Sequence, residues 1–309
     1  MAITILNQTI IMLILMAVGA VCSKTGMISE NTNKDLSRFV LQIVNPVVIF
    51  MSYQTENNAK LVHNLLLTFA LSAGAFAVMI ALSYILIRHK DGRDTAVERF
   101  SAVYSNCGFM GIPLVNALYG MEGVFYLTAF ITTFNIIAWT HGIIMISGEK
   151  DFKKAVKVFY SPTMISIMLG LITFFIQFKL PSIPAKALGY ITELNTPLAM
   201  LVSGVTIAGT DPLKILRKKR VYYVCFLRLL LIPAILSLIL AFIPADEKVR
   251  MTVIVAASAP PAAMCTLQCI RYGKNSLYAS EIFTFGTILS IATLPLVAAI
   301  NERLTNILH

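Results

Sequence analysis

Long apolar runs dominate the chain, and short polar segments separate them. Each run holds about twenty residues, which is enough for an α-helix to cross a hydrocarbon core of roughly 30 Å. None shows the alternating pattern that is typical of a membrane-barrel strand. We therefore expect an all-α polytopic membrane protein. The ten predicted spans are residues 3–21, 36–53, 61–87, 100–118, 123–147, 159–178, 187–208, 221–242, 251–270 and 277–299.

The composition agrees with this fold class. Hydrophobic residues make up 57% of the 309 positions and charged residues only 13%, which is unlike a soluble domain. The first apolar run contains no Lys or Arg and none precedes it, so we interpret it as a membrane helix rather than a secretory signal.

Lysine and arginine are distributed unevenly between alternate loops. The odd-numbered loops hold 18 of them and the opposite side holds six. Because cytoplasmic loops retain basic residues, we expect the odd loops to face the cytoplasm and both termini to lie on the extracytoplasmic side of the cell membrane. The net charge of +10 then reflects topology, with lipid headgroups as its partner, and does not indicate nucleic-acid binding.

The sequence contains no pattern that is typical of an enzyme or a metal site. The five cysteines are scattered and odd in number, which is no disulfide framework. Cys265 and Cys269 lie one helical turn apart, but no nearby histidine or acid completes a metal site. There is no HExxH, GxSxG or paired-carboxylate arrangement, so we expect neither an enzymatic activity nor a cofactor.

Two segments that lie 153 positions apart interrupt apolar spans with glycine or proline. They are Ser105 to Gly120 (SNCGFMGIPLVNALYG) and Ser258 to Gly273 (SAPPAAMCTLQCIRYG), and they share four identities in sixteen positions. Proline removes a backbone donor, and glycine lets the chain leave helical geometry. Matched breaks in two halves of a membrane protein indicate discontinuous helices around a binding site near the membrane midplane.

The two halves of the chain correspond in a second way. Asn45 and Pro46 in the second span recur as Asn195 and Pro197 in the seventh. Division into residues 1–157 and 158–309 gives five spans in each half, and an odd number forces the second half to be inverted relative to the first. The sequence therefore predicts two inverted five-helix repeats.

The broken spans suggest the chemistry of the ligand. Each break exposes the N-terminus of a half-helix, whose amide dipoles favour an anion, and two inverted copies bring two such ends together. A carboxylate is the natural ligand. The alternative is that these glycines and prolines only kink or closely pack membrane helices.

Several segments together resemble the auxin efflux carrier family. They are NCGFMGIPL at 106–114, SAPPAA at 258–263, the prolines at 46 and 197, and IATLPL at 291–296. The resemblance implies a fold related to the bile acid sodium symporters, in which spans four and nine cross where they are broken. It also implies a scaffold of spans one, two, six and seven, a moving core of spans three to five and eight to ten, elevator-type alternating access, and a homodimer formed through the scaffold.

The resemblance also implies the positions of the binding site. They are Asn106, Cys107, Gly108, Gly111 and Pro113 in the first arm, and Ala259, Pro260 and Pro261 in the second. The Asn106 amide is suited to donate to a carboxylate, with capping of the half-helix as the alternative. Asn45 and Asn195 are expected to face this site from the scaffold, or else to satisfy carbonyls freed by the neighbouring prolines.

Apart from Arg38 at the start of the second span, three charged residues fall inside the predicted spans, where charge is usually functional. For Arg228 we favour a side chain that extends to the cytoplasmic interface, over one that attracts an anion. Glu281 is also predicted to be interfacial. Glu193 precedes Asn195 by two residues and is a candidate for proton coupling, or for a hydrogen bond to a neighbouring helix.

The predicted function is secondary active transport of small organic anions. The short connection at 148–157 resembles the compact prokaryotic members of the family, which favours malate-type or malonate-type dicarboxylates over an auxin-like acid. Sodium or protons would be the coupling ions. The alternative is a membrane sensor or scaffold that binds an anion at the crossover without moving it.

Overall fold

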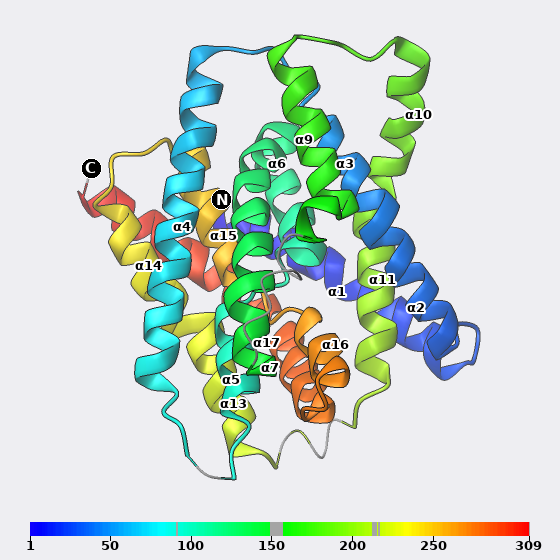
Figure 1. Ribbon diagram of the computed structural model, residues 1–309, viewed down its shortest axis with the longest axis vertical. Coiled ribbons are helices and arrows are strands. Elements are labelled where there is room, and N and C mark those ends of the chain that lie inside the picture. Colours follow the sequence, from blue (N-terminus) through cyan, green and yellow to red (C-terminus); the bar gives the residue numbers. More distant parts are fainter. Residues whose placement is uncertain (91, 149–156, 212–214, 216, 309) are drawn as a thin grey trace.

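The computed structural model describes residues 1–90, 92–148, 157–211, 215 and 217–308, and throughout these ranges the regular structure is helical (Figure 1). The elements are α1 (Ala2–Lys24), α2 (Glu30–Phe39), η1 (Val40–Val44), α3 (Asn45–Ser52), α4 (Ala59–Leu86), α5 (Thr95–Val103), η2 (Cys107–Gly111), α6 (Ile112–Ile137), η3 (Ala138–Gly142), α7 (Ile143–Ser147), η4 (Lys157–Tyr160), α9 (Pro162–Phe175), α10 (Ser182–Glu193), α11 (Asn195–Ala208), α13 (Lys219–Phe226), η5 (Leu227–Leu231), α14 (Ile232–Ala241), α15 (Glu247–Ser258), α16 (Met264–Arg271) and α17 (Ser276–Leu308).

Seven of the described helical segments are long and apolar enough to cross a membrane. They are Ala2–Lys24, Glu30–Ser52, Ala59–Leu86, Cys107–Ser147, Ser182–Ala208, Lys219–Ala241 and Ser276–Thr305. The all-α membrane class is therefore confirmed, whereas the count of ten spans and the inverted repeat stay predictions. The predicted cytoplasmic connection at 149–156 and Lys214 lie outside the described residues.

The apolar segment Cys107–Ser147 is 41 residues long and doubles back on itself at Gly120. The backbone there has φ 61° and ψ −153°, a conformation that glycine adopts without the strain a side chain would bring. A Cβ atom placed on Gly123 would lie 2.8 Å from Cγ1 of Val115, whereas eight residues of continuous helix would separate the two by about 12 Å. The segment is thus two helices packed side by side, and the reversal falls in the predicted gap between residues 118 and 123.

Three short π-helical turns precede prolines inside the spans. Pro46, Pro113 and Pro233 are each the second residue of the helix that follows η1, η2 or η5. A proline in a helix lacks the N–H donor and clashes with the carbonyl four residues earlier. The wider turn resolves this conflict, because the residue before each proline donates to the carbonyl five residues back, as Asn45 does to Val40.

Small residues allow a close helix contact between α1 and α11. A Cβ on Gly204 would lie 1.9 Å from the carbonyl oxygen of Met16, and one on Gly19 would lie 2.3 Å from that of Leu201. Between membrane helices, such close backbone approach supplies the packing that lipid cannot. In Figure 1, α1 (dark blue) slants behind the molecule, while α4 and the α10–α11 pair run along its long axis.

This contact predicts that Gly204→Ala destabilises the protein. The added methyl group would clash with the α1 backbone, and overpacking of this kind costs about 1–3 kcal/mol. Gly189→Ala on α10 is the matched control, because a Cβ there meets nothing within 4 Å and alanine stabilises a helix by about 0.5–1 kcal/mol relative to glycine. Thermal unfolding in detergent measures both, and equal midpoints for the two variants would contradict the prediction.

Candidate functional site

Two interrupted helices meet in the interior of the protein. α5 ends at Val103 and α15 ends at Ser258, and the extended segments that follow them pair as a short antiparallel bridge between Ser105 and Pro261. The Asn106 N–H donates to the carbonyl of Pro260 at 2.7 Å, and the Ala262 N–H donates to the carbonyl of Tyr104 at 2.9 Å. The two chains then re-enter helices at η2 and α16. We call this region, residues 104–106 with 259–263, the crossover.

The second arm of the crossover is shaped by its two prolines. Neither Pro260 nor Pro261 has an N–H group, so α15 cannot continue through them. The Pro261 ring packs directly against α17, where a Cβ on Gly286 would lie 2.6 Å from Cδ of the ring. Ala259, Pro260 and Pro261 are all buried, and the structure brings these three predicted residues to one place.

In the first arm, the helix is interrupted before the chain reaches the glycines that were expected to break it. The non-helical residues are Tyr104 to Asn106, whereas Cys107, Gly108 and Gly111 belong to the π-helical turn η2 and Pro113 to the start of α6. These glycines therefore do not form the break itself. A Cβ on Gly111 would lie 3.4 Å from Cβ of Cys107, which is close to an ordinary van der Waals contact.

The Asn106 side chain is not used as a helix cap. Asn106 occupies the cap position of η2, but no capping hydrogen bond forms, and its amide has no partner among the described residues. The residue is only 7% exposed. The residue is thus mostly buried at the N-terminus of a half-helix, and its side-chain amide, which forms no hydrogen bond with a described residue, is available to a ligand.

Asn45 and Asn195 lie together against the first arm. Nδ2 of Asn195 donates to Oδ1 of Asn45 at 2.6 Å, and both side chains are 4% exposed. Nδ2 of Asn45 lies 3.5 Å from the place where a Cβ of Gly108 would be. The two asparagines thus bond to each other rather than to carbonyls freed by their prolines, and Oδ1 of Asn195 has no hydrogen-bond partner within the described ranges.

Glu193 is not brought to the crossover. It is the last residue of α10, its side chain is exposed, and it forms no ion pair with a described residue. Its predicted part in proton coupling stays a prediction.

Arg228 lies elsewhere than the sequence predicts. Its side chain is fully buried, so the expectation that it extends to the interface is wrong. Its Nε and Nη2 donate to the carbonyl of Ala259 at 3.1 and 2.9 Å, and Nη1 donates to those of Ala102 and Val103 at 3.2 and 3.1 Å. One guanidinium therefore joins the C-terminal ends of α5 and α15. The signal in the sequence was an arginine inside an apolar run that contains no acid.

Glu281 lies in the second turn of α17 and is buried within the protein. It is 3% exposed, and it accepts a salt bridge from Lys218 at 2.6 Å. Its predicted place at the membrane interface stays a prediction. Nearby, Glu98 pairs with Arg220 and accepts a hydrogen bond from the Tyr278 hydroxyl at 3.0 Å. A cavity of about 340 Å³ at the ends of α5, α13 and α17 is lined by Glu98, Lys218, Arg220 and Tyr278, among others. Their ion pairs and hydrogen bonds tie these helix ends together.

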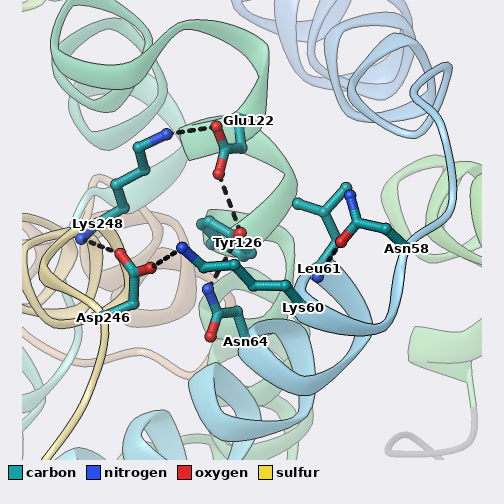
Figure 2. A network of polar contacts seen from close by, with 8 residues as sticks. All are labelled: Asn58, Lys60, Leu61, Asn64, Glu122, Tyr126, Asp246 and Lys248. Atoms are coloured by element: carbon teal, nitrogen blue, oxygen red, sulfur yellow. Dashed lines mark hydrogen bonds and ion pairs between the residues drawn. The ribbon is translucent and has the colours of Figure 1, made fainter.

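A polar network ties the opposite end of α15 to α4 and α6 (Figure 2). Lys248 donates to Glu122, whose other oxygen accepts from the Tyr126 hydroxyl at 3.1 Å, and Asn64 donates to that hydroxyl at 3.3 Å. Lys60 is 3.0 Å from Oδ2 of Asp246. An isolated exposed ion pair contributes little, but a network with shared partners holds the start of α15 in place.

The pKa of Asp246 lies below its ordinary value. Burial by itself raises this pKa, but hydrogen bonds from the Lys60 ammonium and the Lys248 backbone N–H favour the carboxylate and outweigh burial. Asp246 therefore stabilises the folded protein above its unfolded-state pKa, and that contribution is lost as the pH falls through the lower folded-state pKa.

Comparison with known proteins identifies the family. The model of a family described as "Membrane transport protein" matches residues 4–298. The chain belongs to this family. The match confirms the resemblance to the auxin efflux carrier family, which is a family of membrane transporters and not of enzymes. Together with the apolar helices, it fits a multi-pass membrane protein.

Two curated relatives are similar along much of the chain. An uncharacterized transporter of Methanothermobacter thermautotrophicus is 26% identical over 293 residues, which cover 92% of this chain and 94% of the relative. An uncharacterized transporter of Methanocaldococcus jannaschii is 26% identical over 221 residues, which cover 66% of this chain and 69% of that protein.

The Asp246 network predicts a pH-dependent loss of stability. In wild type, acidification from about pH 6 through the lowered folded-state pKa protonates the carboxylate and weakens its bond with Lys60. Asp246→Asn lacks this contribution at every pH, so its deficit in melting temperature relative to wild type should shrink on acidification. Glu247→Gln is the control, since Glu247 is exposed and has no ion pair with a described residue. A deficit that stays constant with pH would refute the assignment.

Proposed function

We propose that the protein is a secondary active transporter of small organic anions, with carboxylates as its substrate class. The observation that supports this proposal is the crossover, where two half-helices begin beside the unpartnered amide of Asn106. Malate-type and malonate-type dicarboxylates are the first candidates, and auxin-like acids are the second.

Electrostatics favours an anion at this place. The first amide groups of a helix have no partner within the helix, and each helix N-terminus carries the equivalent of about half a positive charge. The starts of η2 and α16 together therefore offer about one unit of charge to a ligand. The Asn106 amide adds a directional donor that suits a carboxylate oxygen.

The proposed transport cycle is an elevator. Residues 1–157 and 158–309 would form inverted five-helix repeats with ten spans in total, and spans four and nine would cross in a mobile core of spans three to five and eight to ten. Spans one, two, six and seven would form the scaffold and a homodimer interface. Asn45, whose Nδ2 lies 3.5 Å from the Cβ position of Gly108, and its partner Asn195 would lie where such a core slides against its scaffold.

Both termini are proposed to lie outside the cytoplasm, as the distribution of basic residues favours. Energy would come from an ion gradient or the membrane potential. Glu193 and the crossover are the places where protons or sodium would act.

Uptake by purified protein in liposomes tests this function. Radiolabelled malonate, malate and indole-3-acetate are offered separately, with protein-free liposomes as the control. We expect saturable uptake of at least one of these acids. Ligand-induced thermal stabilisation by a carboxylate without any uptake would overturn transport in favour of a membrane sensor.

Asn106→Ala tests the assigned binding residue. Loss of one hydrogen bond to a charged ligand costs about 1.5–3 kcal/mol, so we expect uptake at low substrate concentration to fall by about one to two orders of magnitude. Asn116→Ala is the matched control, because Asn116 lies on the exposed side of the same arm. Normal uptake by Asn106→Ala at normal expression would remove Asn106 from the site.

A further inference from the structure

Arg228 is a buried cation without an anionic partner. It is 0% exposed, it forms no salt bridge with any described residue, and its side-chain nitrogens contact only backbone carbonyls and the sulfur of Met79. Removal of a charge from water is costly unless strong partners replace the water. The backbone carbonyls must therefore compensate for the loss of water around the Arg228 charge.

The charge of Arg228 is matched by the two helix ends that it joins. Each helix C-terminus carries the equivalent of about half a negative charge, so the ends of α5 and α15 together balance about one positive charge. Ala102, Val103 and Ala259 supply three carbonyls that have no helical N–H partner. The planar guanidinium has five donors and reaches both ends at once, which a compact ammonium group does not.

In transporters with broken helices, freed carbonyls and half-helix C-terminal ends are the groups that bind a coupling cation such as sodium. From this arrangement we infer that Arg228 takes the place of that cation: its guanidinium fills the carbonyl site between α5 and α15, so anion binding at the crossover needs no sodium. The inference rests on the proposed function and narrows its coupling to protons or the membrane potential.

The geometry separates this role from that of a substrate-binding residue. A substrate-binding arginine would direct its donors at the anion, whereas four of the five N–H donors of Arg228 bond to backbone carbonyls. The residue also lies in the π-helical turn η5, before Pro233, and so presents its side chain from a span other than the two that cross. Arg228 is thus a positioning residue, which fixes the helix ends whose opposite halves face the ligand.

Chemical rescue of Arg228→Ala tests the cation site without any substrate. The variant and the wild type are melted in detergent with N-methylglucamine chloride, sodium chloride or methylguanidinium chloride at equal ionic strength. We expect a lower melting temperature for the variant in N-methylglucamine, saturable recovery in methylguanidinium, and no difference between salts for the wild type. Arg220→Ala is the matched control, because Arg220 pairs with an acid instead of carbonyls.

Absence of selective recovery, or equal recovery of Arg220→Ala, would overturn the inference. If Arg228→Ala does not fold, Arg228→Lys serves instead, since it keeps the charge with fewer donors. It should fold with a lowered melting temperature that methylguanidinium does not restore, because the ammonium already occupies the site. If Arg228→Lys melts at the same temperature as the wild type, one of the two helix ends needs no donor from residue 228. That result would also contradict the inference.

Uptake supplies the readout that a purely structural arginine would not affect. Wild-type liposomes should take up malonate equally from sodium and N-methylglucamine buffers, whereas a saturable sodium requirement would show a separate cation site and overturn the inference. If the proposed function is wrong, no acid is taken up in either buffer. The rescue experiment still shows in that case whether Arg228 fills a cation site.

Discussion

The structure depends on how it satisfies backbone groups at helix ends that lie inside a membrane. In hydrocarbon there is no water to bond an exposed N–H or C=O, and each unsatisfied group costs several kcal/mol. α5 and α15 stop in the interior nonetheless. Their extended continuations pair with each other at Ser105 and Pro261, and their last carbonyls bond to Arg228. Each break is thereby stabilised by the other, which explains why the two occur together.

The prolines and glycines of the chain serve this arrangement in different ways. Pro260 and Pro261 end a helix outright, because neither has a donor for the next turn. Pro113 and Pro233 leave their helices intact, because a π-helical turn before each one absorbs the missing hydrogen bond. Gly286 lets α17 pack against a proline ring of the crossover. The same residue type therefore breaks one span and only widens another, depending on the turn that precedes it.

The sequence predicted which segments meet at the candidate site better than it predicted how their side chains interact. The prolines at 260 and 261 and the asparagines at 45 and 195 are brought to the crossover region, because helix breakers and kinks act locally and leave a local pattern. The role of Arg228 could not be predicted in this way. Its acceptors lie 31 and about 125 positions away, and which carbonyls are free becomes evident only when two distant helices meet.

The C-terminal and N-terminal helix ends at the crossover consequently differ in whether the charge that balances them is part of the chain. The C-terminal ends bond to the guanidinium of Arg228, a cation that is covalently attached to the chain and therefore cannot diffuse away. Under the proposed function, the N-terminal ends, which have only Asn106 and their own amides, would keep about one unit of positive potential until an anion binds. Such a carrier would bind its coupling charge once, during folding, and would exchange only the anion. Selectivity for the sign of the charge would then be a property of the fold, whereas the choice among anions would depend on the few side chains around Asn106.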